Sequence, residues 1–474
     1  MNIDINLKFF SFTRKISINR QWFQLGIIAV VILIVMIAAY WGSMKTMVFI
    51  SVFPLCIVGL YFFIRQPNLI YILILLGGMF VPFAGPGGFN ASVLLIILLV
   101  FLWIMDMFVV KRQFWFVYSR PIRPILYFLA TSVVAFAVGQ ISWFSFASQA
   151  PLKTQLGGFA IYFLLPLTTF ITPNLIKDMY WLKVVFWTFI GLSMVYVTGR
   201  ALGLSFADRI YQHGYIANSM LWTWLVSLIF SQVIYNHELK WRPRALLIIF
   251  VIVIFYVDIS QNYDWKSGWV PAVVAAAALV GLRFKKLAVF AIPFVFAVGV
   301  YLASDLIAGE AWSWGTRLDA WIVVLNISSV SPLVGVGFAN YYWYARVFSI
   351  RGYSISFNSH SQFIDLIAQT GILGLLCFFW ILFEVSRLAW DLSQRLNDGF
   401  ARGYAYGVLV GVLGSLMAAF LVDWVLPFAY NIGLDGVRAS ILPWIFFGGL
   451  ISIEQIYFSK SKPGSLNIHE QSLR

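Results

Sequence analysis

The chain has 474 residues, of which 61% are hydrophobic and only 11% are charged, and its mean hydropathy is +0.88. A water-soluble globular protein could not bury so much apolar surface, so the composition excludes that class and indicates an all-α polytopic membrane protein. The net charge of +14 fits the basic cytoplasmic loops of such a protein, so it is no indication of nucleic-acid binding.

A helix that crosses the bilayer needs about 20 largely apolar residues. On this criterion the sequence predicts fourteen spans, at 22–41, 46–64, 69–84, 89–110, 124–144, 156–172, 182–199, 219–235, 245–260, 269–282, 287–304, 367–387, 403–424 and 437–457. The segments 69–84 and 269–282 are short, so we expect 12 to 14 transmembrane helices. Gly407, Gly411 and Gly414 predict close helix packing in the thirteenth span.

Loops rich in Lys and Arg stay in the cytoplasm, and this rule gives the orientation. It predicts a cytoplasmic N-terminal tail (1–21), a single transmembrane domain (22–458) and a cytoplasmic C-terminal tail (459–474). Only nine of the 32 Lys and Arg then lie on the outer side, namely Lys45, Lys153, Arg200, Arg209, Lys266, Arg317, Arg346, Arg351 and Arg438. The sequence therefore predicts a multi-pass membrane protein with both termini in the cytoplasm.

One long polar segment, at about 305–366, interrupts the series of spans and is expected to face outward. It contains Arg317, Arg346, Arg351 and His360. Residues 318–330 carry apolar side chains at helical spacing, which predicts a short helix along the membrane surface. This segment is the candidate catalytic loop, because it concentrates cations and a histidine in a chain that has few of either.

The outer cations suggest a phosphate ligand. Arg200, Arg209, Lys266 and Arg317 lie at helix ends in three separate outer loops, against the retention rule. Arginine offers a fixed fork of donors that suits phosphate oxygens, and lysine supplies a point charge. A diphosphate head group is the partner that we expect for these four residues. The alternative is that such side chains contact lipid phosphates or helix C-termini.

Two of the four histidines, His213 and His360, fall on the outer side. An imidazole at His360 could accept a proton from an acceptor hydroxyl near neutral pH, so we expect His360 and Arg317 to be catalytic. The supporting residues are His213, Asp365, Asp319 and Ser361, with the two aspartates as partners that orient His or Arg. No acidic cluster indicates a metal, and no cofactor is expected.

These residues resemble the signature region of the bacterial O-antigen ligase and O-antigen polymerase superfamily. The resemblance rests on Gly335-Val336-Gly337, on Ser359-His360-Ser361-Gln362-Phe363, on Gly371-Ile372-Leu373-Gly374, and on Arg317 followed by Trp321. Weaker similarities are Lys266-Ser267-Gly268-Trp269 and the loop that contains Arg209. Two positions depart from the pattern, since Ser361 replaces the usual Asn and Lys266 stands where Arg is common.

The resemblance implies a metal-independent membrane glycosyltransferase of cell-surface polysaccharide synthesis. Such an enzyme transfers a glycan from undecaprenyl diphosphate to a hydroxyl of another glycan, of lipid A core or of a protein, at the outer face of the inner membrane. The sequence leaves open which of these acceptors is used. The alternative function is a flippase for lipid-linked oligosaccharides or another secondary transporter, which would show charged residues within spans and repeated halves.

Overall fold

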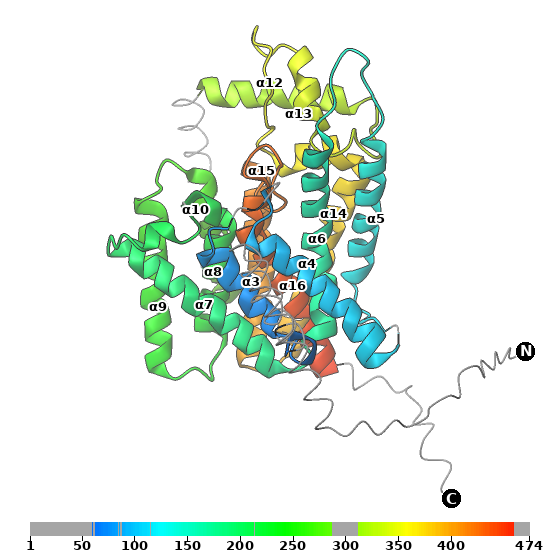
Figure 1. Cartoon of the computed structure of the whole chain (residues 1–474). Helices are drawn as coiled ribbons and strands as arrows, with labels where there is room; N and C mark the ends of the chain where they lie inside the picture. Colours follow the sequence, from blue (N-terminus) through cyan, green and yellow to red (C-terminus); the bar gives the residue numbers. More distant parts are fainter. Residues whose placement is uncertain are drawn as a thin grey trace, which may run out of the picture. The chain divides into compact units, whose positions relative to one another are not determined.

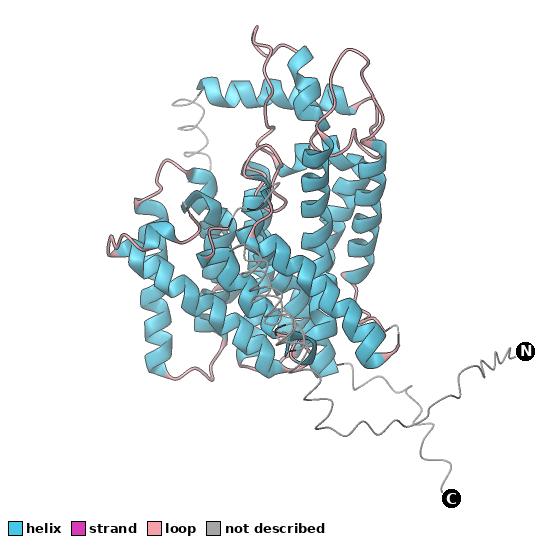
Figure 2. Ribbon diagram, viewed as in Figure 1, coloured by secondary structure: helices cyan, strands magenta, loops and turns pink. Residues whose placement is uncertain are grey.

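The structure is a computed structural model that describes residues 59, 62–83, 85, 88–113, 115–212, 214–286 and 311–458. Figure 2 shows helices joined by loops, and no strand is present among the described residues. Seven of the described helices are long and apolar enough to cross a membrane. The predicted all-α polytopic membrane fold is therefore confirmed. The helices below all belong to the compact unit that begins at Pro67.

The elements follow one another along the chain as labelled in Figure 1. They are α3 (Leu69–Phe80), α4 (Ala91–Met105) with η2 (Asp106–Lys111), α5 (Ile122–Val138), α6 (Leu152–Leu175), α7 (Met179–Ala201), η3 (Ala207–Arg209), η4 (Gly214–Ala217), α8 (Asn218–Tyr235), α9 (Trp241–Phe255) with η5 (Tyr256–Ser260), α10 (Lys266–Arg283), α12 (Ala311–Ser328), α13 (Asn340–Tyr344), η6 (Ala345–Val347), α14 (Gln362–Arg395), α15 (Phe400–Leu421), η7 (Gly433–Gly436) and α16 (Val437–Phe458).

Eleven of the predicted spans, from 69–84 to 269–282 and from 367–387 to 437–457, coincide with α3 to α10 and α14 to α16. The predicted spans 22–41, 46–64 and 287–304 lie wholly or almost wholly outside the described residues. The total of 12 to 14 spans therefore stays a prediction.

The glycines of α15 bring this helix close to α8. A Cβ atom at Gly407 would lie 2.6 Å from the Ser231 hydroxyl, and one at Gly411 would lie 2.9 Å from the Trp224 ring. Larger side chains would force the two helices apart. The predicted packing role of these glycines is confirmed, and it fixes the position of the loop that follows α15.

Helices α12 and α13 lie together at one end of the bundle, beyond α14 and α15 (Figure 1). Val324 and Ile327 on α12 are buried with Tyr341 and Tyr344 of the α13 region. This apolar contact anchors the segment that links α12 to α14. A helix is thus present at the predicted position 318–330, although it runs from Ala311 to Ser328, and its place along the membrane surface stays a prediction.

The two glycine motifs of the family resemblance, at Gly335 and Gly371, contact each other through the backbone. Gly335 and Gly371 both have positive φ angles, of 74° and 70°. A Cβ atom at Gly371 would lie 2.2 Å from the Leu333 carbonyl, and one at Gly335 would lie 2.6 Å from the backbone of Gln369. The chain around residue 335 therefore packs directly against the first turns of α14, where Gly371 interrupts the helical conformation. This contact fixes the beginning of α14, next to His360.

Candidate functional site

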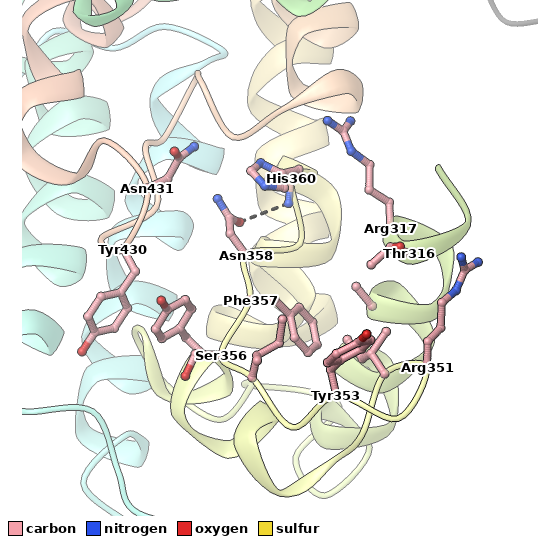
Figure 3. A pocket seen from close by; sticks show the side chains of 14 residues that line it. Thr316, Arg317, Arg351, Tyr353, Ser356, Phe357, Asn358, His360, Tyr430 and Asn431 are labelled. Atoms are coloured by element: carbon pink, nitrogen blue, oxygen red, sulfur yellow. Dashed lines mark hydrogen bonds between the residues drawn. The ribbon is translucent and has the colours of Figure 1, made fainter. Parts of the chain in front are cut away.

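A pocket of about 790 Å³ opens at the α12 end of the bundle. Its lining comes from α12, from the segment that precedes α14, and from the loop after α15 (Figure 3). The lining residues are Thr316, Arg317, Ala320, Tyr342, Ile350, Arg351, Tyr353, Ile355, Ser356, Phe357, Asn358, His360, Tyr430 and Asn431. We call it the His360 pocket. It brings together the two residues predicted to be catalytic, His360 and Arg317.

The main chain at His360 has the left-handed conformation, with φ of 49°. Non-glycine residues rarely adopt this conformation, although histidine and asparagine do so more often than most. The backbone N–H of His360 donates to the Asn358 side-chain oxygen at 3.1 Å, which helps to hold the turn (Figure 3). The turn thus places the imidazole on the pocket wall just before α14 begins.

A buried hydrogen-bond network supports this turn from behind. The Asp365 carboxylate accepts hydrogen bonds from the Tyr341 hydroxyl at 2.5 Å and from the Ser359 hydroxyl at 2.7 Å. Burial, together with the neighbouring Asp365 charge, raises the pKa of Tyr341 well above its ordinary value, so the hydroxyl keeps its proton and donates it. Asp365 therefore positions the residue before His360 and does not contact the imidazole itself.

The loop after α15 carries a second buried carboxylate, Asp423. It accepts hydrogen bonds from the side-chain amide of Asn358 at 3.3 Å, from that of Asn431 at 2.9 Å, and from the backbone N–H of Phe428 at 2.8 Å. Asn358 and Asn431 both line the His360 pocket. Asp423 thus connects two walls of the pocket. One wall is the segment before α14, and the other is the loop after α15.

Three effects act on the proton affinity of His360. Burial lowers the pKa of the imidazole below its ordinary value, the Asp423 carboxylate opposes this change, and the Arg317 cation adds to it. The net result is a lowered pKa, so the neutral, proton-accepting form is favoured near pH 7. This is the form that a general base requires.

The cations of the pocket come from two elements. Arg317 extends from α12, and Arg351 lies in the segment before α14, where its Nε atom is 2.7 Å from the Asp319 carboxylate. Asp319 therefore pairs with an arginine, as expected, although that arginine is Arg351. The lining includes no Asp or Glu side chain. The pocket is thus suited to an anionic group.

Three predicted ligands of a diphosphate do not line this pocket. Arg200 donates to the Gln261 side chain at 3.1 Å and pairs with Asp208 at 3.4 Å. Arg209 is exposed on η3, and Lys266 begins α10. Arg200 and Lys266 nevertheless lie near the same loop, because Gln261 precedes the start of α10.

Lys266 is connected to the site through its neighbour in the sequence. The rings of Trp265 and Trp424 meet edge to face, with centroids 5.8 Å apart. Trp424 directly follows Asp423, so the beginning of α10 packs beside the loop that holds the pocket wall. Two of the predicted supporting residues remain. Ser361 is buried and does not line the pocket, and His213 lies outside the described residues.

The sequence-based prediction missed Asp423, Asn358 and Arg351 as members of the site. Arg351 was counted among the outer cations, without a role. Asp423 had one detectable signal, since it is the charge that directly follows the apolar span of α15.

Among the described residues, no group of three or more His, Cys, Asp or Glu side chains is placed to hold a metal ion.

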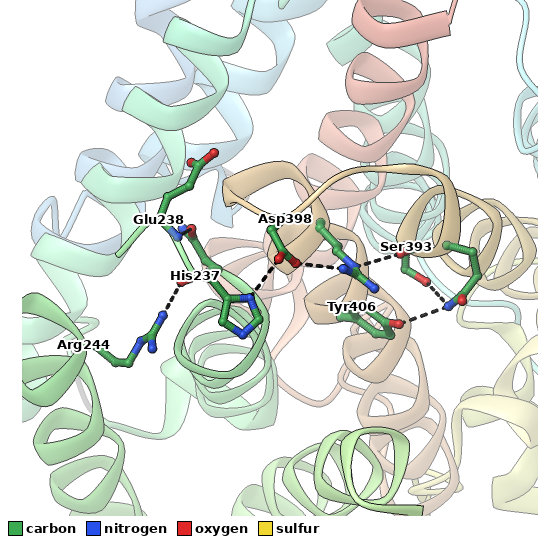
Figure 4. Close-up of polar contacts among 9 residues, drawn as sticks. His237, Glu238, Arg244, Ser393, Asp398 and Tyr406 are labelled. Carbon is green, nitrogen blue, oxygen red and sulfur yellow. Dashed lines mark hydrogen bonds and ion pairs between the residues drawn. The ribbon is translucent and has the colours of Figure 1, made fainter. Parts of the chain in front are cut away.

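A second polar cluster lies at the other end of α15. His237 contacts Asp398 at 3.3 Å, and Arg402 pairs with the same carboxylate at 2.8 Å (Figure 4). These side chains are about half exposed or less, and they line a pocket of about 730 Å³. Exposed ion pairs of this kind contribute little free energy. The cluster connects the loop after α8 to the loop before α15.

The model of the O-antigen ligase family matches residues 219–379, which include α8, α12 and the segment with Arg317 and His360. This match confirms the resemblance to the O-antigen ligase and polymerase superfamily. A search of curated proteins found no match to the chain.

Proposed function

We propose that this chain, an integral membrane protein with an O-antigen ligase domain, transfers a glycan from undecaprenyl diphosphate to an acceptor hydroxyl at the outer face of the inner membrane. One observation carries the proposal. His360 and Arg317, from elements separated in the sequence, line the same pocket. A proton acceptor and a stabiliser of negative charge are the two groups that this reaction needs.

His360 is the proposed general base. The acceptor hydroxyl gives its proton to the neutral imidazole while its oxygen forms a bond to the anomeric carbon of the donor sugar. The bond from that carbon to the phosphate oxygen breaks at the same time, and the lipid diphosphate leaves with the electron pair. Support comes from the lowered pKa of His360, which favours the neutral imidazole before the reaction.

Asp423 is the proposed partner of the protonated imidazole. Its carboxylate is buried, and its charge favours the protonated form of His360. The connection through Asn358 also holds the backbone of His360. We therefore assign Asp423 a positioning and electrostatic role, because it does not line the pocket itself.

Arg317 is the proposed catalytic cation on the leaving diphosphate. Charge accumulates on the phosphate oxygens as the bond to the sugar breaks, and a guanidinium already in place stabilises it. Arg351, which is partly neutralised by Asp319, is a second candidate contact for the same group. Arg200, Arg209 and Lys266 are proposed to bind the diphosphate as the donor lipid approaches from the bilayer.

The direct test is transfer by the purified protein in lipid nanodiscs. The donor is a defined glycan on undecaprenyl diphosphate, and the acceptors, in separate reactions, are lipid A core, a second donor molecule and a protein. Mass spectrometry would detect the product and the released lipid diphosphate. Release only in the presence of one acceptor supports the proposal and identifies that acceptor. Absence of product with every acceptor contradicts it.

A transporter is the second candidate, and one observation favours it. Asp258, near the end of the α9 span, is fully buried, and neither of its carboxylate oxygens has a hydrogen-bond partner. Buried carboxylates within spans often mark ion pathways. Movement of a fluorescent lipid-linked glycan across vesicle membranes, abolished in Asp258→Asn and unaffected in His360→Asn, would support this function over glycan transfer.

A further inference from the structure

A smaller pocket lies beside the His360 pocket and shares one wall residue with it. Its volume is about 250 Å³, and the shared residue is Asn431. The other lining residues are Gly88, Lys153, Thr154, Gly157, Ile161, Ala429, Ile432, Gly433, Leu434 and Asp435. We call it the Lys153 pocket. Apart from Asn431, its residues have no part in the proposed mechanism.

The Lys153 pocket is open to a ligand at two glycines. At both Gly157 and Gly433, a Cβ atom would meet no other atom within 4 Å. Glycines at such positions let a ligand approach the backbone closely. Drug-sized ligands occupy pockets of roughly 300 Å³ or more, so this pocket suits a smaller group, such as one ring of a longer molecule.

The polar lining favours a neutral, hydroxyl-rich group over a diphosphate. Lys153 supplies one positive charge, Asp435, which pairs with Arg438 at 3.6 Å, supplies acceptor oxygens, and Thr154 and Asn431 supply neutral polar groups. The His360 pocket contains Arg317 and Arg351 and has no carboxylate in its lining. A diphosphate therefore belongs to the His360 pocket, whereas mixed donors and acceptors match the hydroxyl groups of a sugar.

Asn431 is held in place between the two pockets. Its side-chain amide donates to Asp423 at 2.9 Å, and its backbone N–H donates to the Phe428 carbonyl at 3.0 Å. A molecule that passes Asn431 would extend from the His360 imidazole to Lys153. A glycan, which continues beyond the sugar that reacts, has this form.

We propose that the Lys153 pocket binds a sugar residue of the glycan next to the residue that reacts in the His360 pocket. This inference rests on the proposed function. The sugar belongs either to the donor glycan or to the acceptor glycan, and the two sources make the same contacts. The pocket would then select which glycan is transferred, or which glycan is extended.

The test uses the full-length protein in nanodiscs with Gly157→Trp, which fills the pocket. The control is Gly191→Trp, since Gly191 is also a helical glycine with no atom within 4 Å of its Cβ position, but it does not line the pocket. Lys153→Ala is the second variant. We expect Lys153→Ala to raise KM about tenfold, the loss of about one charge-assisted hydrogen bond, and Gly157→Trp to raise KM at least as much because it blocks the pocket. At saturating substrate, kcat should stay within about twofold.

The source of the sugar follows from which KM changes. A rise confined to the donor KM identifies the donor glycan, and a rise confined to the acceptor KM identifies the acceptor glycan. If the parent protein transfers glycan but both variants keep parental KM values for both substrates, the inference is wrong while the proposed function stands.

A binding measurement tests the pocket apart from the reaction. The probe is the free oligosaccharide released from the donor lipid, titrated calorimetrically into the parent, Gly157→Trp and Gly191→Trp proteins. We expect weaker binding only in Gly157→Trp. Equal heats in all three proteins, or no binding to the parent, would overturn the inference.

Discussion

Asp423 is connected to His360 through one side chain, that of Asn358. The amide of Asn358 donates to the Asp423 carboxylate at 3.3 Å, and its oxygen accepts the backbone N–H of His360 at 3.1 Å. The loop after α15 is thereby connected to the turn that precedes α14. This relationship connects the packing of the helices to the proton affinity of the proposed base.

The pH dependence of transfer should respond in opposite directions to the two charges near His360. The Asp423 carboxylate raises the pKa of His360, and the Arg317 cation lowers it. Asp423→Asn should therefore move the acidic limb of the activity profile to lower pH, and Arg317→Gln should move it to higher pH. Profiles of kcat/KM against pH measure both shifts.

In the parent protein, the lowered pKa of His360 places this limb below about pH 6.5, the ordinary value for histidine. A parent limb above that value, or shifts of the same sign in both variants, would contradict the assignment of the limb to His360.

Gly371→Ala should destabilise the folded protein. The backbone conformation there, with φ of 70° and ψ of −174°, is accessible almost only to glycine, and a Cβ atom would lie 2.2 Å from the Leu333 carbonyl. Strain of about 1–3 kcal/mol and overpacking of about 1–3 kcal/mol predict a loss of roughly 2–6 kcal/mol. Thermal unfolding in detergent measures it against Gly191→Ala, which we expect to differ little from the parent.

The cations should differ in their importance for the donor. Arg317→Ala should reduce kcat/KM most, by about 10- to 100-fold, the value of one to two charge-assisted hydrogen bonds. Arg200→Ala, Arg209→Ala and Lys266→Ala should mainly raise the donor KM, and Lys266→Arg should retain activity. Steady-state kinetics with varied donor concentration separate these effects. Parental kinetics in all four alanine variants would exclude the diphosphate assignment.

The segment between α12 and α14 is proposed to face the periplasm or the cell exterior. Ser354 is exposed in this segment, and Asn397 is exposed at the other end of α14. In a chain whose two native cysteines are replaced by alanine, Ser354→Cys should react with an impermeant thiol reagent in cells with a permeabilised outer envelope. Asn397→Cys should react only after lysis. The reverse labelling would invert the topology and contradict the proposed outer-face reaction.

Much of the fold could be predicted from the sequence because a membrane-spanning helix requires a long run of apolar residues, which the sequence shows directly. Apolar runs of suitable length locate α3 to α10 and α14 to α16, and glycine spacing indicates the packing of α15. Local signals also singled out His360 and Arg317, a rare histidine and a cation placed against the retention rule, and both line the same pocket. Each of these signals lies within a short stretch of sequence.

The rest of the site depends on contacts between distant segments, which no local pattern records. Asp423 reaches Asn358 only because the loop after α15 folds over the start of α14. The same limitation applies to Arg200, whose position at a helix end gives no indication of its neighbours Gln261 and Asp208. The Lys and Arg residues at helix ends predict on which side of the membrane a loop lies, but they do not predict which side chains those cations contact in the fold.

The central claim is that His360 accepts the proton of the acceptor hydroxyl. Its φ of 49° makes His360→Asn the most informative substitution, because asparagine tolerates this conformation and cannot act as a base. His237→Asn is the matched control, since His237 lies in the polar cluster at the other end of α15.

The decisive measurement is the single-turnover rate of glycan transfer with saturating donor and acceptor. We predict that His360→Asn lowers this rate by about 10²- to 10⁴-fold, the contribution of a general base, while donor affinity and thermal stability stay near parental values. His237→Asn should transfer at the parental rate. A folded His360→Asn protein that transfers glycan within a few-fold of the parent would show that His360 is not the base.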